Sequence, residues 1–98
     1  MEQSGGKRFE WDESKRQSNL VKHRIDFLDV RGLFRGRPVV TKDSPYPNEE
    51  RLLTTGIIGD HFVTVVWTRR NDAIRFISAR RARDDEVRAY RELHGGRD

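Results

Sequence analysis

The feature that most constrains the fold is a pair of β-strand patterns between residues 61 and 82. In the first, 61–68, seven of the eight residues are β-branched or aromatic, which is typical of a sheet interior. Asn71 and Asp72 then interrupt the pattern, and both residue types tolerate the positive φ of a two-residue hairpin turn. The second pattern, 74–82, ends in paired arginines. We therefore expect an antiparallel hairpin that places cationic side chains where an anion could bind.

The remaining segments are expected to extend this hairpin into a sheet and to cover it. Further strands are expected at 8–11, 39–41 and 50–58, with a loop at 42–48. Asp12 should cap a helix that ends near His23, and Asp26 should cap a second helix from 27 to about 35. A third helix is expected at 84–94, with Val87, Tyr90 and Leu93 at core spacing. The order β-α-α-β-β-β-β-α predicts an α+β fold, a largely antiparallel sheet with helices packed on one face.

The length of 98 residues predicts one domain. We expect a disordered N-terminal tail at 1–8, a single domain at 9–94 and a flexible C-terminus at 95–98.

Two-residue turns at 59–60 and 71–72 would fix the register of three strands. One face, which we assign to the helices, then carries Leu52, Val63, Val65, Trp67, Ile74 and Phe76. On the opposite face Arg51, Thr68 and Arg75 form one row. Two guanidinium groups and a hydroxyl in a row could hold a phosphate.

The charge balance favours a polyanionic partner. There are 20 Lys and Arg residues against 16 Asp and Glu, and the net charge is +4. The chain contains no cysteine, which excludes disulfides and thiolate metal sites. We find no glycine-rich cofactor loop, no metal-ligand cluster and no apolar run of membrane-spanning length. We therefore expect a cytoplasmic protein with no cofactor and no metal site.

Several separate blocks of residues occur in a characteristic order. They are Phe9-Glu10-Trp11-Asp12, Lys15, Asn19-Leu20, Lys22-His23, Glu49-Glu50-Arg51, Gly56, the run from Arg75 to Ala82, Glu86 and Tyr90. Together they resemble the BrnT family of toxins, over roughly residues 9–92. Two positions depart from the family pattern: Arg24 stands where a helix-ending glycine is usual, and Arg83 where a helix-capping threonine is usual.

The resemblance implies the RelE-like microbial ribonuclease fold. It further implies a type II toxin, an endoribonuclease that cleaves RNA without a metal ion and inhibits translation. The implied partner is a BrnA-like ribbon-helix-helix antitoxin, which would inhibit the toxin in a 2:2 assembly formed through antitoxin dimerisation. Promoter DNA would be bound only through that antitoxin.

Metal-free RNA cleavage needs proton transfer and a cation that stabilises charge on the phosphate. As catalytic candidates we select His23, Glu50, Arg75 and Arg80. As RNA-binding candidates we select Lys22, Arg51, Thr68, Arg69 and Arg81.

Most of these candidates have a purely structural alternative. His23 could bond carbonyl groups at the end of its helix, and Glu50 could hold Arg51 rather than act as a base. Strict alternation puts Arg80 on the helix face, unless the strand ends or a β-bulge redirects it, and puts Arg81 on the open face. Trp67 is expected to be buried rather than to stack on RNA bases.

A different class of function remains open on the same residues. A non-catalytic module that binds or regulates nucleic acid would use the arginines only to hold backbone phosphates. An acid–base residue close to the arginine row would separate the two hypotheses.

Overall fold

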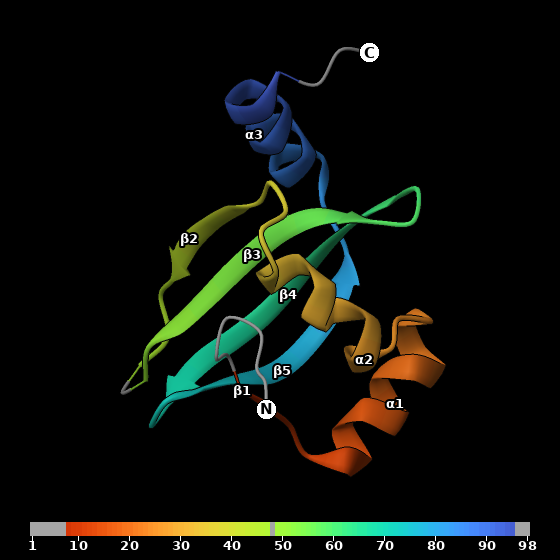
Figure 1. The fold of residues 1–98 in the computed structure, drawn as a ribbon, viewed down its shortest axis with the longest axis vertical. Helices are drawn as coiled ribbons and strands as arrows, with labels where there is room; N and C mark the ends of the chain where they lie inside the picture. The colour runs from red at the N-terminus through yellow and green to blue at the C-terminus, as the bar shows by residue number, and fades with distance from the viewer. Residues whose placement is uncertain (1–7, 48, 96–98) are drawn as a thin grey trace.

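The structure is a computed structural model that describes residues 8–47 and 49–95. Five strands form one sheet: β1 (Arg8–Glu10), β2 (Val40–Ser44), β3 (Arg51–Ile58), β4 (His61–Arg70) and β5 (Ala73–Arg81). Their spatial order is β1-β5-β4-β3-β2 (Figure 1). β1 runs parallel to β5, and every other neighbouring pair is antiparallel. The predicted α+β class, element order and largely antiparallel sheet are confirmed.

Two tight turns set the register of the central strands, as predicted. Ile58 pairs with His61 and Arg70 pairs with Ala73, so each turn has two residues. Asn71 has a φ of 57°, the conformation that an Asn-Asp turn was expected to supply. The strand β2 is longer than expected, because residues 42–44 pair with β3 instead of forming a loop.

The first helical layer begins at two aspartate caps. Asp12 accepts a hydrogen bond from the Ser14 backbone N–H and starts α1 (Glu13–His23), and Asp26 caps α2 (Phe27–Val30) through Leu28. The predicted second helix is only partly α-helical, since 31–34 forms a 3₁₀ helix, η2 (Arg31–Phe34). Gly32, a poor helix former, lies in this tightened turn.

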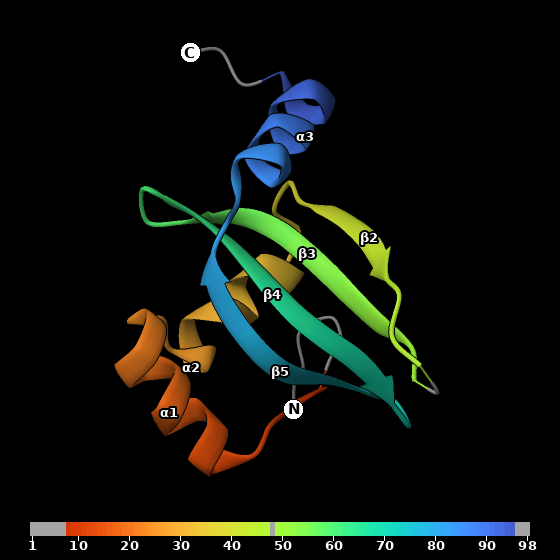
Figure 2. The ribbon, with the colours of Figure 1, turned by 180° about the vertical axis from the view of Figure 1, so that it is seen from behind.

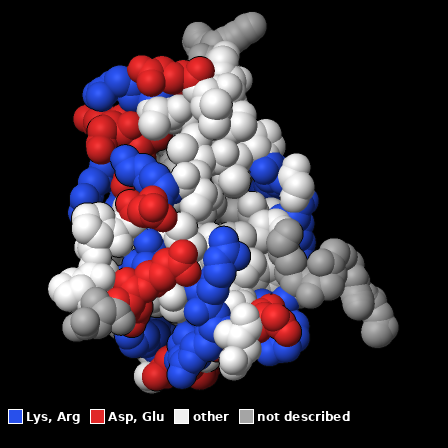
Figure 3. Space-filling view, turned by 90° about the vertical axis from the view of Figure 1, so that its left-hand side faces the viewer, with Lys and Arg blue, Asp and Glu red and all other residues white. Residues whose placement is uncertain are grey.

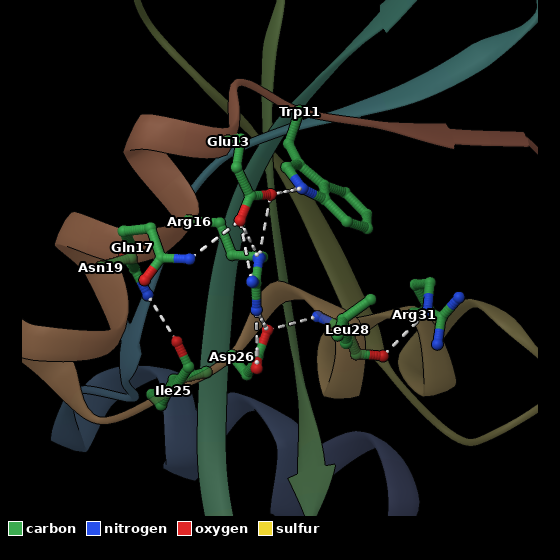
Figure 4. Close-up of polar contacts among 9 residues, drawn as sticks. All are labelled: Trp11, Glu13, Arg16, Gln17, Asn19, Ile25, Asp26, Leu28 and Arg31. Carbon is green, nitrogen blue, oxygen red and sulfur yellow. Dashed lines mark hydrogen bonds and ion pairs between the residues drawn. The ribbon is translucent and has the colours of Figure 1, made fainter.

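An ionic cluster joins α1 to the cap of α2. The Arg16 guanidinium lies between Glu13, at 2.8 Å, and Asp26, at 3.0 Å (Figure 4). Hydrogen bonds from Arg16, Gln17 and Trp11 lower the pKa of Glu13 to about 2. The cluster fixes the angle between the two helices and so positions the C-terminal half of α1 beside β5.

The apolar face of the sheet packs against α2 and η2. Phe27, Val30 and Leu33 are buried against the predicted set of sheet residues, and Trp67 is 5% exposed. The Trp67 indole N–H donates to Thr54 Oγ1 at 2.7 Å, which confirms the expected burial. The β3 backbone approaches η2 closely at Gly56, where an added Cβ would lie 2.7 Å from Leu33 Cδ2.

The third helix, α3 (Asp84–His94), packs on the opposite side of the sheet from α2. Glu86 accepts a hydrogen bond from Thr64, and Tyr90 packs against Phe62. Both of these β4 residues alternate with the core residues of the strand and therefore lie on its other face. Figure 2 shows this face of the sheet, with α2 behind it and α3 above its end. The expectation that the helices share one face therefore holds for the first helical layer and not for α3. Leu93, expected in the core, is 65% exposed.

The predicted tails lie almost wholly outside the described residues. Arg8 is the exception at the N-terminus, because it begins β1 by pairing with Ala73. Gly95 is the exception at the C-terminus, where it ends α3 with a φ of 67°.

Candidate functional site

A row of polar side chains crosses three strands on the sheet face opposite α2. Thr68 on β4 pairs with Arg75 on β5, and Arg51 begins β3 next to Leu52, the partner of Trp67. All three side chains line one cleft of about 510 Å³. The row predicted from the turn register is therefore present in the structure.

Short hydrogen bonds hold two members of this row, Arg51 and Thr68. The Arg51 Nε donates to Glu49 Oε2 at 2.6 Å, and its guanidinium lies 3.6 Å from the centroid of the Tyr46 ring. The Thr68 hydroxyl donates to the Glu50 carbonyl oxygen at 2.6 Å. Thr68 therefore fixes the backbone from which the Glu50 side chain projects.

Arg75 is held more loosely than Arg51. Its Nη1 lies 3.4 Å from Glu10 Oε2 on the neighbouring strand β1, and its side chain is 30% exposed. At this length the contact is weak for a charge-assisted hydrogen bond. Arg75 can therefore turn to an incoming phosphate at small cost.

The other residues of the cleft add charge on both sides of the row. Among the described residues, its lining consists of Lys15, Glu49, Glu50, Arg51, Thr68, Arg69, Arg70, Arg75 and Ile77. Figure 3 shows that cations and acids are interleaved along one side and the lower end of the molecule. The predicted candidates Glu50, Arg51, Thr68 and Arg75 are thus brought together. Arg69 also lines the cleft, but its guanidinium lies 5.4 Å from the centroid of the Trp67 ring, on the sheet face that carries α2.

Lys15 is one of four described cleft residues that were not selected from the sequence, together with Glu49, Arg70 and Ile77, and it is the one that comes from a helix. It shares a helix face with Asn19 and His23, at i, i+4 and i+8. Asn19 is buried: its side-chain amide donates to the Ile25 carbonyl oxygen, and its carbonyl accepts from the Ala79 backbone N–H, both at 3.0 Å. This docking of α1 on β5 brings Lys15 to the cleft, and the shared face was the available signal.

His23 and Lys22 lie at the opposite end of the same helix. His23 follows Lys15 by eight positions of α-helix, which corresponds to about 12 Å along the helix axis. Neither residue is among those that line the cleft in the described part of the chain. The structure does not bring His23 together with Glu50 and Arg75, and its catalytic role stays a prediction.

Arg80 is engaged in a buried ion pair rather than in the cleft. Its two terminal nitrogens donate to the two Glu86 carboxylate oxygens, at 2.8 and 2.9 Å, and the Glu86 side chain is 7% exposed. Burial opposes ionisation of Glu86, but hydrogen bonds from Arg80, the Arg83 backbone N–H and Thr64 outweigh it and lower the pKa of Glu86 to about 2. The pair fastens the first turn of α3 to the sheet.

A β-bulge explains why Arg80 points to this side. Trp67 pairs with Phe76 and Val66 pairs with Ser78, so Ile77 is an extra residue in β5. The bulge reverses the alternation beyond it, placing Arg80 opposite Thr64 and Arg81 opposite Val63. The predicted placement of Arg81 on the open face is therefore wrong, because it assumed uninterrupted alternation.

Among the described residues, no three or more His, Asp or Glu side chains group in a way that could hold a metal ion. In the same part of the chain, every helix is too short or too polar to cross a membrane.

Comparison with known proteins identifies the family of the chain. No curated protein matches the sequence. Residues 11–86 match the family described as ribonuclease toxin, BrnT, of type II toxin-antitoxin system. This segment contains every predicted site residue and the whole cleft. The chain belongs to the BrnT family of type II toxin–antitoxin ribonuclease toxins.

Proposed function

We propose that the chain is an endoribonuclease that cleaves RNA at the cleft without a metal ion and so inhibits translation. The observation that carries the proposal is the convergence of Arg51, Arg75, Lys15 and Arg70 on one cleft that also contains Glu50. Guanidinium groups bind phosphate oxygens in pairs and stabilise the charge that develops during attack on phosphorus. Cation density of this kind supplies the stabilisation that a metal ion provides in other nucleases.

The two arginines of the row suit different tasks. Arg51 is held by Glu49 and by the Tyr46 ring, so its position is fixed before RNA arrives. Arg75 has only the long contact with Glu10 among its described partners and can follow the phosphate into the transition state. We therefore assign ground-state phosphate binding to Arg51 and transition-state stabilisation to Arg75.

The proposal extends to the partner that the toxin family requires. We propose a BrnA-like ribbon-helix-helix antitoxin that covers the cleft, assembles with the toxin in a 2:2 complex and carries the complex to promoter DNA. The cytoplasm, where RNA and ribosomes are present, is the proposed location. Support comes from the family and from the cationic cleft, which an acidic segment of a partner would complement.

The experiment is an RNA cleavage assay in EDTA. The wild type should cut RNA and leave a 2′,3′-cyclic phosphate or a 3′-phosphate. Arg75→Ala should lose activity by roughly 10²–10³-fold, as for loss of one charge-stabilising group. Arg88→Ala, which removes an exposed arginine of α3 outside the cleft, is the matched control and should retain full activity.

Two outcomes would contradict the proposal. Cleavage that stops in EDTA and returns with magnesium would show a metal-dependent reaction. RNA binding without cleavage under all conditions would favour the alternative, a non-catalytic nucleic-acid-binding module.

A further inference from the structure

The cleft contains few groups that can transfer a proton. Of the nine described residues that line the cleft, four are arginines, which stay protonated in proteins and cannot exchange a proton at neutral pH. Thr68 donates its hydroxyl to the Glu50 carbonyl, and Ile77 is apolar. Lys15, Glu49 and Glu50 remain.

Glu49 already has a partner inside the cleft. Its Oε2 accepts a 2.6 Å hydrogen bond from Arg51, and removing that carboxylate from Arg51 would release the arginine that the row depends on. Lys15 and Glu50 are therefore the proton carriers best placed to serve a reaction. At neutral pH the carboxylate of a glutamate is an acceptor and the ammonium of a lysine is a donor.

The fold places these two residues at opposite ends of the arginine row. Glu50 immediately precedes β3, whereas Lys15 belongs to α1, which docks on β5 through Asn19 and Ala79. The strand β4 lies between β3 and β5, so the row spans two strand spacings, about 10 Å. A phosphate bound at the centre of the row, near Thr68, would have an acceptor on one side and a donor on the other.

We infer that Glu50 is the general base and Lys15 the general acid of RNA cleavage, an inference that rests on the proposed ribonuclease function. The Glu50 carboxylate takes the proton of the ribose 2′-hydroxyl, and the freed electron pair of the 2′-oxygen forms a bond to phosphorus. The bond from phosphorus to the 5′-oxygen breaks, and that oxygen takes a proton from the Lys15 ammonium. The products are a 2′,3′-cyclic phosphate and a 5′-hydroxyl, with Glu50 protonated and Lys15 neutral until water restores both.

The arrangement suits an in-line displacement. The attacking and leaving oxygens lie on opposite sides of phosphorus, so the base and the acid must also approach from opposite sides. Thr68 becomes a positioning residue, because its hydroxyl holds the backbone of Glu50.

The test compares two substrates, one RNA linkage with the natural 5′-oxygen and one with a bridging 5′-sulfur. A thiolate leaves without protonation, so a variant that lacks the general acid should recover on the sulfur substrate. Lys15→Met should lose about 10²–10³-fold on the oxygen substrate and return to within a few-fold of the wild type on the sulfur substrate. Glu50→Gln should lose a similar factor on both substrates, since the 2′-hydroxyl must be deprotonated in each case.

Two control variants separate proton transfer from charge and from folding. Lys15→Arg keeps the positive charge without an exchangeable proton, so it should bind RNA like the wild type yet remain slow on the oxygen substrate. Arg88→Met, outside the cleft, should match the wild type on both substrates. Lys15 and Glu50 are exposed, so their variants should keep the wild-type melting temperature.

Three results would overturn the inference. Full activity of Lys15→Arg would show that Lys15 acts by charge alone. Equal loss of Lys15→Met on both substrates would exclude a role in protonating the leaving group. A wild-type protein that cleaves neither substrate would overturn the ribonuclease assignment itself, and the two roles with it.

Discussion

Removal of the Glu86 carboxylate should destabilise the protein because four hydrogen bonds converge on it. It accepts from the Thr64 hydroxyl, from two nitrogens of Arg80 and from the Arg83 backbone N–H, at 2.8 to 2.9 Å. Glu86→Ala would leave the Arg80 guanidinium, 19% exposed, without its carboxylate. It would also leave the buried Thr64 hydroxyl without this acceptor.

The size of the effect follows from two independent estimates. The pKa of Glu86 falls from an ordinary 4.5 to about 2, and a difference of about 2.5 at about 1.4 kcal/mol per pKa unit corresponds to about 3.5 kcal/mol. Removing one partner of a buried ion pair generally costs about 3–5 kcal/mol. Because Arg80 still reaches solvent, we expect the lower end of that range, about 3 kcal/mol.

The pH dependence provides a second, more specific measurement. The folded-state pKa lies below the unfolded-state pKa, so the contribution of Glu86 is fully present above pH 4.5 and is lost as pH falls towards 2. Urea unfolding should show that the stability difference between wild type and Glu86→Gln narrows over this interval. The matched control is Glu92→Ala, an exposed carboxylate on the same helix, which should change stability by less than about 0.5 kcal/mol.

A Glu86→Ala variant whose urea midpoint at pH 7 equals that of the wild type would refute this stabilising role of Glu86. A stability difference between wild type and Glu86→Gln that stays constant from pH 7 to pH 2 would also refute it.

Three further predictions concern packing, a helix end and the antitoxin. Trp67→Ala should lose about 3–5 kcal/mol in urea unfolding, because the indole is buried, and an unchanged midpoint would reverse its assignment. Arg24→Gly should raise the free energy of unfolding by about 1 kcal/mol, because Arg24 ends α1 with a φ of 60°, a conformation that glycine adopts without strain. A lower melting temperature would contradict this. Combined Arg69→Ala and Arg75→Ala should slow antitoxin association and reduce its salt dependence in stopped-flow measurements, and unchanged rates would place the antitoxin elsewhere.

Short-range patterns predicted most of the fold because its three central strands, β3, β4 and β5, are joined by tight turns. Once 59–60 and 71–72 are two-residue turns, the strand register follows without tertiary information, and so does the row of Arg51, Thr68 and Arg75. The aspartate caps predicted the starts of α1 and α2 for the same local reason. The side of the sheet that α3 covers depends on contacts distant in sequence, and its charged composition gave no indication of it.

The errors near the site arise from features that alternation cannot represent. The bulge at Ile77 put Arg81 on the face opposite to the predicted one, and it redirected Arg80 in the way that the β-bulge alternative allowed. The structure shows the effect in the burial of Phe76 and Ala79, which are three positions apart, whereas regular alternation requires an even spacing between buried residues. Lys15 was missed because its place depends on the docking of α1 through Asn19, which a helical pattern alone does not specify.

The bulge also lies between two arginines with different roles, whose alanine variants would give the same result in a simple activity assay. Arg75, before the bulge, lines the cleft and has a long contact with Glu10, whereas Arg80, after it, is bound to the buried Glu86. Alanine at either position is expected to reduce RNA cleavage, at Arg75 by loss of charge stabilisation and at Arg80 by loosening α3. Only stability measurements distinguish the two, since Arg75→Ala should unfold at the wild-type midpoint and Arg80→Ala should not. Loss of activity by an Arg80 variant is therefore evidence of catalysis only when its unfolding free energy is unchanged.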